Sequence, residues 1–309
     1  MSQETNTKSI TEKSLPTYET ATGPIEFTLK SDLLFHYVMQ RSKPALIGLV
    51  CSLKGISPDT VKDLEVMNPI DISAAPKETV MDLKLTLNSN EIINIELQVY
   101  WDKYWIKRSL LYMCRGYDCL EEGDDYSKLK PTTHFCIADL DILPGNTSFY
   151  SSYYLMEEKT HQIYSKNLSI GVLQLQYIDN ATEVDSNNNL VFWAKLFNAK
   201  TWEEFKDIAC DNPVIKEVGD LMLMMNMDQK EREILEGQRR YREQVASQYT
   251  AGYTDAEEKL TPVIDELQEK IDAANKTISE DKKTIAERDK TIADLQAQLK
   301  RALEKAQKG

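Results

Sequence analysis

The stretch from Thr79 to Tyr100 constrains the fold of this chain more than any other. It holds two alternating runs, Met81 to Leu87 and Ile93 to Val99, with apolar residues at every second position and a turn of Asn88-Ser89-Asn90 between them. Successive side chains of a β-strand point to opposite faces, and two such runs joined by a short Asn/Ser turn are typical of a β-hairpin. We therefore predict a hairpin with one apolar and one polar face.

The polar face of this hairpin brings two acidic residues together. If the turn is centred on Ser89, Asp82 lies opposite Glu96, and Gln98 stands beside Glu96 on the same face. A bulge would shift the pairing by one residue and still leave the two carboxylates as neighbours. Like charges across a strand pair are destabilising, and one group is normally driven toward its protonated form. A bound divalent cation such as Mg²⁺ removes the conflict, because carboxylate oxygens are its preferred ligands.

The same pattern has a plainer interpretation. Hairpins with one solvated face commonly carry acids there, and Lys84 lies on that face to neutralise part of the charge. The residues of the hairpin leave the metal site and the solvated face open as alternatives.

The acidic pair is also part of a recognisable motif. Asp82 followed across the turn by Glu96-Leu97-Gln98 resembles the PD-(D/E)XK nuclease motif, and in particular the recombination-promoting (Rpn) nucleases and the transposases of that group. Gln98 replaces the lysine of the wider superfamily, although Gln is usual in this group. The resemblance extends from about Thr28 to Ala256 and includes three further segments: Leu29–Phe35, Arg108–Tyr112 and Gly123–Pro131.

This resemblance implies a divalent-metal-dependent DNA endonuclease that hydrolyses phosphodiester bonds with Mg²⁺ or Mn²⁺. Asp82 and Glu96 would be catalytic metal ligands, and the backbone carbonyl of Leu97 a further ligand. Gln98 would orient the attacking water or contact a phosphate oxygen. Ser31 or Asp32 caps the first helix; the alternative for Asp32 is that it joins the cluster as an accessory acid.

Charge bears on how such a protein would meet DNA. The net charge of −13 weighs against a broad phosphate-binding surface, but it leaves room for a local one. Lys107 and Arg108 belong to a basic cluster just after the motif and are candidates for DNA phosphate contacts; a solvated helix face is the alternative for each. Two features favour a second possibility: Gln98 stands in place of the superfamily lysine, and the net charge is negative. That possibility is a catalytically weak or inactive nuclease-fold protein that acts as a DNA-binding or oligomeric scaffold.

The remaining patterns predict an α/β fold with a PD-(D/E)XK-like core. We expect the order α-β-β-β-α-β, in which a mixed sheet is flanked by helices, as in the resembled superfamily. The expected elements are helices at Leu29–Gln40, Pro44–Leu53 and Trp101–Leu120, and strands at Leu64–Ile70, in the hairpin and at His134–Leu140. Tyr150–Met156 and Val172–Ile178 either extend the sheet or form a separate layer. From Leu190 onward the pattern becomes helical.

We divide the chain into four parts: a disordered arm (1–23), a nuclease-like α/β core (24–185), a helical C-terminal region (186–256) and a coiled-coil tail (257–309). The five cysteines form no C-x-x-C pair, and their odd count argues against a disulfide framework. No apolar run reaches the roughly 20 residues of a membrane span. A cytoplasmic location, without membrane contact, fits these features.

The tail has the most regular periodicity in the chain. Isoleucine or leucine recurs every seventh residue, as at the a positions of a coiled coil: Ile264, Ile271, Ile278, Ile285, Ile292 and Leu299. Asp281 and Arg288 at d positions weaken the middle of this stripe. We expect a homo-oligomer formed through the tail; a single solvated helix is the alternative.

Overall fold

The predicted hairpin lies within a six-stranded mixed sheet of strand order β1-β2-β3-β4-β6-β5. The computed structural model describes residues 16–70, 82–210 and 212–306. Its strands are β1 (Leu64–Val66), β2 (Leu83–Leu87), β3 (Glu91–Gln98), β4 (Thr132–Ala138), β5 (Tyr150–Met156) and β6 (Ile163–Gln174). Strands β3, β4 and β6 run parallel, whereas the other neighbouring pairs are antiparallel.

The register of the hairpin is the predicted one. Leu83 pairs with Ile95 and Leu87 with Glu91, so the turn is centred on Ser89. Asn88 and Ser89 take positive φ angles of 51° and 55°, and the Asn88 side chain fixes the turn by accepting hydrogen bonds from the backbone of residues 62 and 63. Asp82 directly precedes β2, and continuing the same register places it opposite Glu96.

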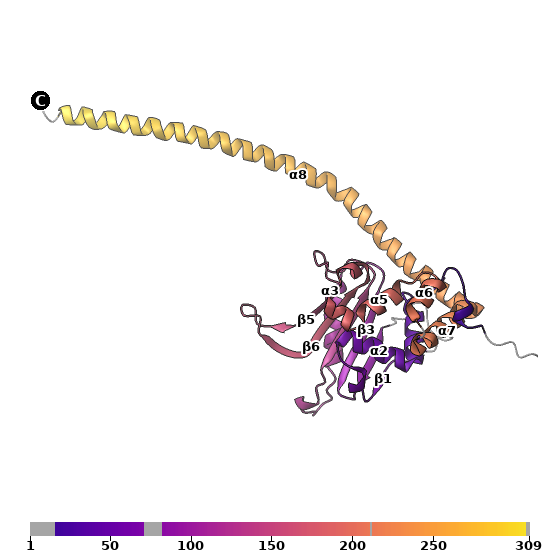
Figure 1. The fold of residues 1–309 in the computed structure, drawn as a ribbon. Helices are drawn as coiled ribbons and strands as arrows, with labels where there is room; N and C mark the ends of the chain where they lie inside the picture. Colours follow the sequence, from indigo (N-terminus) through magenta and orange to yellow (C-terminus); the bar gives the residue numbers. More distant parts are fainter. Residues whose placement is uncertain (1–15, 71–81, 211, 307–309) are drawn as a thin grey trace, which may run out of the picture. The chain divides into compact units, whose positions relative to one another are not determined.

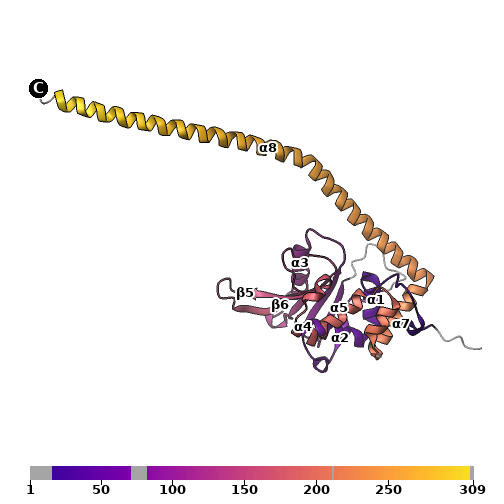
Figure 2. The ribbon, with the colours of Figure 1, turned by 45° about the horizontal axis from the view of Figure 1, so that its top comes forward.

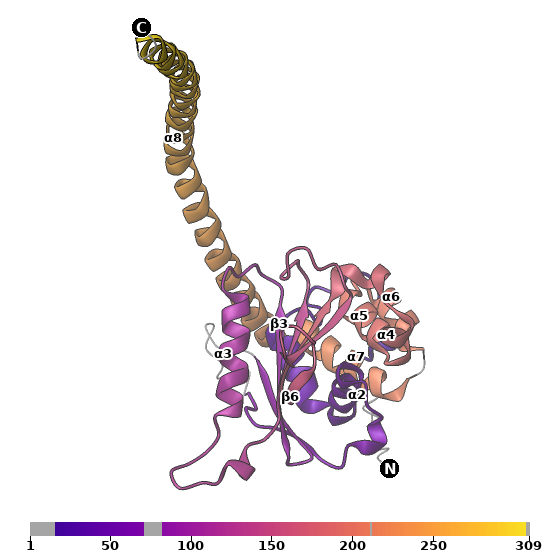
Figure 3. The ribbon, with the colours of Figure 1, turned by 90° about the vertical axis from the view of Figure 1, so that its left-hand side faces the viewer.

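Helices cover both faces of the sheet. Those of the chain are α1 (Asp32–Arg41), α2 (Lys43–Lys54), α3 (Trp105–Tyr117), α4 (Glu183–Asn187), α5 (Leu190–Asn198), α6 (Trp202–Ala209), α7 (Pro213–Met227) and α8 (Gln229–Ala306), with short 3₁₀ turns η1 (Tyr18–Thr20), η2 (Pro58–Thr60), η4 (Tyr126–Lys128) and η5 (Leu175–Asn180). Helix α3 lies on one face of the sheet, and α2, α4, α5, α6 and α7 lie on the other (Figures 2 and 3). The α-β-β-β-α-β order is therefore confirmed.

Alternation along the strands divides the interior into two clusters. Ile93 and Ile95 of β3, with Phe135 and Ile137 of β4, face the main core beneath α1, α2, α5 and α7. The other face of β4 contributes Cys136 and Ala138 to a smaller cluster around Trp105 of α3. Polar residues of β3 lie on this second face, under α3, and are not bathed in solvent.

Several expected boundaries shift. The first helix begins at Asp32, later than Leu29, because Ser31 has extended backbone. The strand expected over Leu64–Ile70 ends at Val66. Strands β5 and β6 extend the sheet at its edge (Figure 1), which decides between the two alternatives for these segments. The expected strand Val172–Ile178 is wrong beyond Gln174, where the chain forms η5.

Part of the segment that we assigned to an N-terminal arm packs onto the folded body. Tyr18 is buried and stacks edge-on against Phe205, and its backbone N–H donates to Asp220 at 2.9 Å. Residues 1–15 of the expected arm lie outside the described residues.

The chain divides into two units, Met1–Ala246 and Ser247–Gly309, and α8 contributes to both. In the second unit the heptad isoleucines lie exposed on a continuous helix (Figure 1). The four predicted part boundaries stay predictions. All five cysteines are free thiols. Within the described residues, no helix combines the length and apolarity needed to cross a bilayer.

Candidate active site

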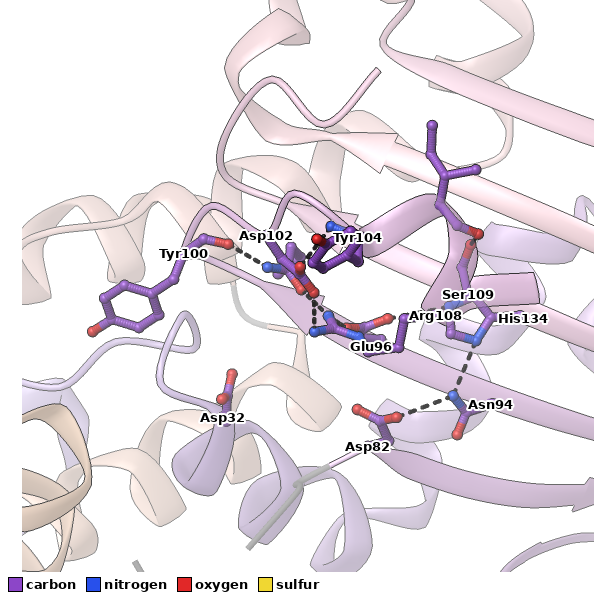
Figure 4. Close-up of polar contacts among 12 residues, drawn as sticks. Asp32, Asp82, Asn94, Glu96, Tyr100, Asp102, Tyr104, Arg108, Ser109 and His134 are labelled. Carbon is purple, nitrogen blue, oxygen red and sulfur yellow. Dashed lines mark hydrogen bonds and ion pairs between the residues drawn. The ribbon is translucent and has the colours of Figure 1, made fainter. Parts of the chain in front are cut away.

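Three elements bring acidic and amide side chains together beneath α3. Glu96 and Gln98 project from β3 and are only 4% and 7% exposed. Asp82 enters from the start of β2, where the Asn68 side chain accepts from Lys84 N and donates to the Asp82 carbonyl at 2.8 and 2.7 Å. The strand register and this clamp fix the position of Asp82 relative to Glu96 (Figure 4).

A chain of polar contacts joins the two carboxylates. The Asn94 amide nitrogen donates to Asp82 Oδ2 at 3.4 Å and to His134 Nδ1 at 3.0 Å. Because an amide nitrogen only donates, Nδ1 accepts, and a neutral His134 ring then carries its proton on Nε2. That atom lies 3.3 Å from Glu96 Oε2. His134 is fully buried, so its ring has a fixed position beside the Glu96 carboxylate.

Arg108 approaches the same carboxylate from α3. Its Nη2 donates to Glu96 Oε1 and to Gln98 Oε1, the latter at 2.5 Å, and its Nη1 donates to Asp102. Gln98 in turn donates through Nε2 to the Tyr100 carbonyl. Both ends of the Gln98 amide are therefore engaged, and one guanidinium links β3 to the loop that leads into α3 (Figure 4).

Burial and mutual repulsion perturb the acids of the site. Burial, reinforced by the negative charge of Glu96, raises the pKa of Asp82 to about 6. Burial also acts to raise the pKa of Glu96, but the contacts with His134 and Arg108 outweigh it and hold that pKa below its usual value. Glu96 is thus the carboxylate that stays ionised, and Asp82 is the carboxyl that takes up a proton as the pH falls through about 6.

Asp32 extends this acidic cluster from the first turn of α1. Ser31 is the N-cap residue of that helix, and no side-chain hydrogen bond caps it, so the capping role does not describe Asp32. Burial, with Glu96 as a further cause, raises the pKa of Asp32 to about 6, against the opposing charge of Arg242. Arg242 of α8 contacts Asp32 Oδ2 at 2.6 Å. Asp32 therefore lies close enough to Glu96 for their charges to interact (Figure 4).

The donor set suits a hard cation with few protein ligands. Asp32 Oδ1 is a buried carboxylate oxygen that accepts no hydrogen bond from the described residues, which is a state that a cation would relieve. Across residues 16–70, 82–210 and 212–306, no three His, Cys, Asp or Glu side chains converge as a metal cage. Mg²⁺ is commonly held by one or two carboxylates with waters and substrate phosphate completing its shell, so the residues fit this ion.

The structure brings most of the predicted residues into one place. Asp82, Glu96 and Gln98 lie together, with Asp32 beside them. Leu97 packs its side chain against the core on the opposite face, so only its backbone is offered to the site. Arg108 points inward to Glu96, whereas Lys107 is exposed and lies 5.7 Å from the Tyr104 ring centroid.

Sequence reasoning missed His134 and the bridging role of Asn94. Both lie on the polar face, because Asn94 pairs with His134 across the parallel strands β3 and β4. The residues that separate them contain α3, so no local pattern relates the two. The available signal was His134 itself, a polar residue at the position of β4 that points away from Phe135 and Ile137.

Fold and site together define a mixed α/β protein that carries a pair of carboxylates, the half-buried Asp82 and the buried Glu96, on a central hairpin. A family model described as PD-(D/E)XK nuclease family transposase matches residues 29–252. The chain belongs to this family, as the motif around Asp82 and Glu96 predicted. Searches of curated proteins and of solved structures return no significant match.

Proposed function

We propose that this protein is a divalent-metal-dependent DNA endonuclease that hydrolyses phosphodiester bonds. The observation that carries the proposal is the pairing of Asp82 with the buried Glu96 on the hairpin, where desolvation, reinforced by the charge of Glu96, raises the pKa of Asp82 to about 6. A protein gains nothing in stability from placing two such groups together, but a phosphodiesterase needs them to bind Mg²⁺ or Mn²⁺. Membership of a nuclease family supports the same activity.

Each residue of the site has a distinct role in this proposal. Asp82 and Glu96 hold the cation, with the Leu97 carbonyl as a further ligand and Asp32 as an accessory acid. When bound, the cation supplies a more acidic water and offsets charge on the scissile phosphate. Gln98 orients the attacking water or contacts a phosphate oxygen, and it does so only after giving up one of its two internal hydrogen bonds. His134 and Asn94 position the carboxylates.

Lys107 and Arg108 are the proposed phosphate contacts. Lys107 is exposed and available to a DNA backbone. Arg108 reaches a phosphate only by exchanging its contact with Glu96 for one with the substrate. Such an exchange keeps the guanidinium paired with an anion in both states, which limits its cost.

Nicking of supercoiled plasmid by the purified protein tests the activity. We expect cleavage that requires Mg²⁺ or Mn²⁺, stops with EDTA, and is lost in Asp82→Ala and Glu96→Ala. Glu65→Ala is the matched control, because Glu65 is an exposed acid on β1 of the same sheet. Equal cleavage by the wild type and both site variants would trace the activity to a contaminant and remove the enzymatic proposal.

A second function competes with this one on a specific observation. Arg108 already neutralises Glu96, and Gln98 lacks the charge of a lysine, which suits a nuclease fold retained as a DNA-binding or oligomeric scaffold. Thermal melting separates the two. A metal-binding site predicts a higher midpoint with Mg²⁺ or Mn²⁺ in the wild type and a smaller rise in Asp82→Ala, whereas a scaffold without a metal site predicts no shift in either.

We further propose that the protein acts as a homo-oligomer assembled through the heptad stripe of α8. The isoleucines of this stripe are about half exposed in the single chain, as Ile278 and Ile285 illustrate at 51% and 56%. Two copies would bring two sites to one DNA molecule, which suits cutting of both strands.

A further inference from the structure

An exposed aromatic and basic surface adjoins the candidate site. We define the 101–107 surface by the side chains of Trp101, Lys103, Tyr104 and Lys107, which lie between the end of β3 and the first turn of α3. Trp101 and Tyr104 are 55% and 56% exposed. The ammonium groups of Lys103 and Lys107 lie 5.8 and 5.7 Å from the Tyr104 ring centroid, and neither lysine forms an ion pair with any described residue.

Hydrogen bonds join the segment that carries this surface to residues of the candidate site. Asp102 accepts from the Tyr104 backbone at 2.8 Å and from Arg108, which also binds Glu96. The Tyr100 carbonyl accepts from Gln98. Trp105, the next residue, is 3% exposed and packs in the cluster beneath α3. The backbone that carries the two exposed rings is therefore held by the same polar groups that hold Glu96 (Figure 4).

Rings and lysines in this arrangement match the chemistry of an unstacked nucleotide. A base offers a flat face that stacks on Trp or Tyr, and its phosphate pairs with a neighbouring ammonium group. In an intact duplex the bases are stacked on one another, so they are not available to such rings. The surrounding protein is acidic, with a net charge of −13, so two cations without an acidic partner among the described residues mark where a phosphate chain is favoured.

We propose that the 101–107 surface binds unpaired nucleotides next to the scissile phosphate, so that the preferred substrate is single-stranded or locally unpaired DNA. This inference rests on the proposed nuclease function and adds a substrate class to it. The rival occupant is a protein, either a second copy or another partner, packed on Ile106 and Leu110 nearby, both exposed. The lysines around Tyr104 favour DNA.

Binding measured without metal tests this surface separately from cleavage. In EDTA, with Asp82→Ala as the background, fluorescence anisotropy compares a labelled oligothymidine with a duplex of equal length. We expect tighter binding of the single strand. Trp101→Ala and Tyr104→Ala should each weaken that binding by about 5- to 150-fold and change duplex binding little. Tyr126→Ala, which removes an 81% exposed ring in η4, should leave both unchanged.

Intrinsic fluorescence identifies the ring involved. Trp101 is the exposed one of the four tryptophans, since Trp105, Trp193 and Trp202 are 3%, 3% and 4% exposed. Oligothymidine should quench the wild type. Trp101→Phe should lose the quenching and keep most of the affinity, because a phenyl ring still stacks. Lys103→Gln and Lys107→Gln should each lower the salt slope of binding by roughly 0.7.

Two results would overturn the inference. One is that the background protein binds the single strand and the duplex with equal affinity, and that Trp101→Ala does the same. The other is unchanged DNA binding in Trp101→Ala, accompanied by loss of self-association in sedimentation, which would assign the surface to a protein interface. Metal-independent binding of single strands stands whether or not the wild type cleaves DNA, so failure of the endonuclease proposal is recognised separately, in the plasmid assay.

Discussion

At the scale of single residues, the candidate site opposes the stability of the protein that contains it. Asp82 has a pKa of about 6 in the folded chain against 3.8 ordinarily. Between these two values the folded state holds its proton more tightly than the unfolded state, so stability falls as pH rises. Above pH 6 the loss is complete and amounts to at most about 3 kcal/mol.

Asp82→Asn should therefore stabilise the metal-free protein. At pH 8 in EDTA we expect the free energy of unfolding to rise by about 1–3 kcal/mol, because the amide cannot ionise. The gain should shrink as pH falls through 6 and vanish near pH 4, where the wild-type carboxyl is protonated. Urea unfolding at three pH values measures it. A gain that does not change with pH would mean that ionisation of Asp82 is not its cause.

Arg108 supplies the positive charge that a cation would otherwise bring to Glu96. Removing it leaves a buried carboxylate without a strong partner, so Arg108→Gln should lower the metal-free stability by about 1–3 kcal/mol, less than for a fully buried pair, because the Arg108 side chain is 31% exposed. The variant should also regain more stability from Mg²⁺ than the wild type does, since the cation no longer competes with the guanidinium.

Melting midpoints with and without Mg²⁺ give both quantities. Arg115→Gln on the same helix is the matched control, because no described residue forms an ion pair with Arg115, and it should behave as the wild type. If Mg²⁺ shifts Arg108→Gln by no more than it shifts the wild type, guanidinium and cation do not compete for Glu96.

Residues of the site were predictable only as far as local pairing extends. Asp82 and Glu96 belong to one hairpin, and its register follows from the alternation around Ser89. His134 joins them through parallel pairing with β3, which depends on how α3 crosses the sheet. The inward turn of Arg108 is likewise a tertiary choice, since a basic residue on an amphipathic helix is as readily solvated.

At the scale of elements, the polar site is buried because α3 lies close to the sheet. Gly116 permits this approach: a Cβ there would lie 2.7 Å from the Thr132 methyl group and 3.6 Å from Ile92. Thr132 is a buried residue of β4, so it has little room to move. The strands supply the carboxylates, but the helix excludes water from them.

Gly116→Ala should lift α3 from the sheet and weaken the site without touching it. Overpacking of this kind destabilises by about 1–3 kcal/mol, against a gain of up to about 1 kcal/mol in helix propensity. Thr132→Ser removes the opposing methyl group, so the double variant should recover most of the loss. Gly252→Ala is the control, because no atom lies within 4 Å of its Cβ position. Chemical unfolding of the wild type, the two single variants, the double variant and Gly252→Ala tests the prediction, and a double variant as unstable as Gly116→Ala would contradict it.

Elements with a strong local pattern were predictable, and their ends were not. Helix α2 follows its apolar periodicity and stops where Gly55 takes a positive φ of 64°. The segment after Gln174 alternates like a strand, yet it forms η5, because the sheet ends there and its apolar residues pack on the main core instead. Alternation alone does not distinguish these two outcomes.

At the scale of the whole molecule, the described part of the second unit, residues 247–306, is a single stretch of α8, and its heptad positions are exposed. Ile264 to Leu299 recur at a positions and are 51–62% exposed, and Thr277, Thr284 and Thr291 each donate to the carbonyl four residues earlier. A solvated helix has no need of isoleucine at every seventh residue. Burying the exposed half of one such side chain in a dimer contributes roughly 1 kcal/mol.

Charge placed in this stripe should separate the copies. Ile278→Asp with Ile285→Asp puts four buried carboxylates into a two-stranded coil, and we expect the full-length chain to become monomeric in sedimentation equilibrium. Ser279→Asp with Ala286→Asp adds the same charge on the neighbouring b positions and should preserve the oligomer.

If the enzyme cuts both strands through paired sites, the monomeric variant should still nick plasmid but produce far less linear product. An oligomer that survives the isoleucine changes would mean that α8 does not hold the copies together, and unchanged linear product from a monomer would mean that one site cuts both strands in turn.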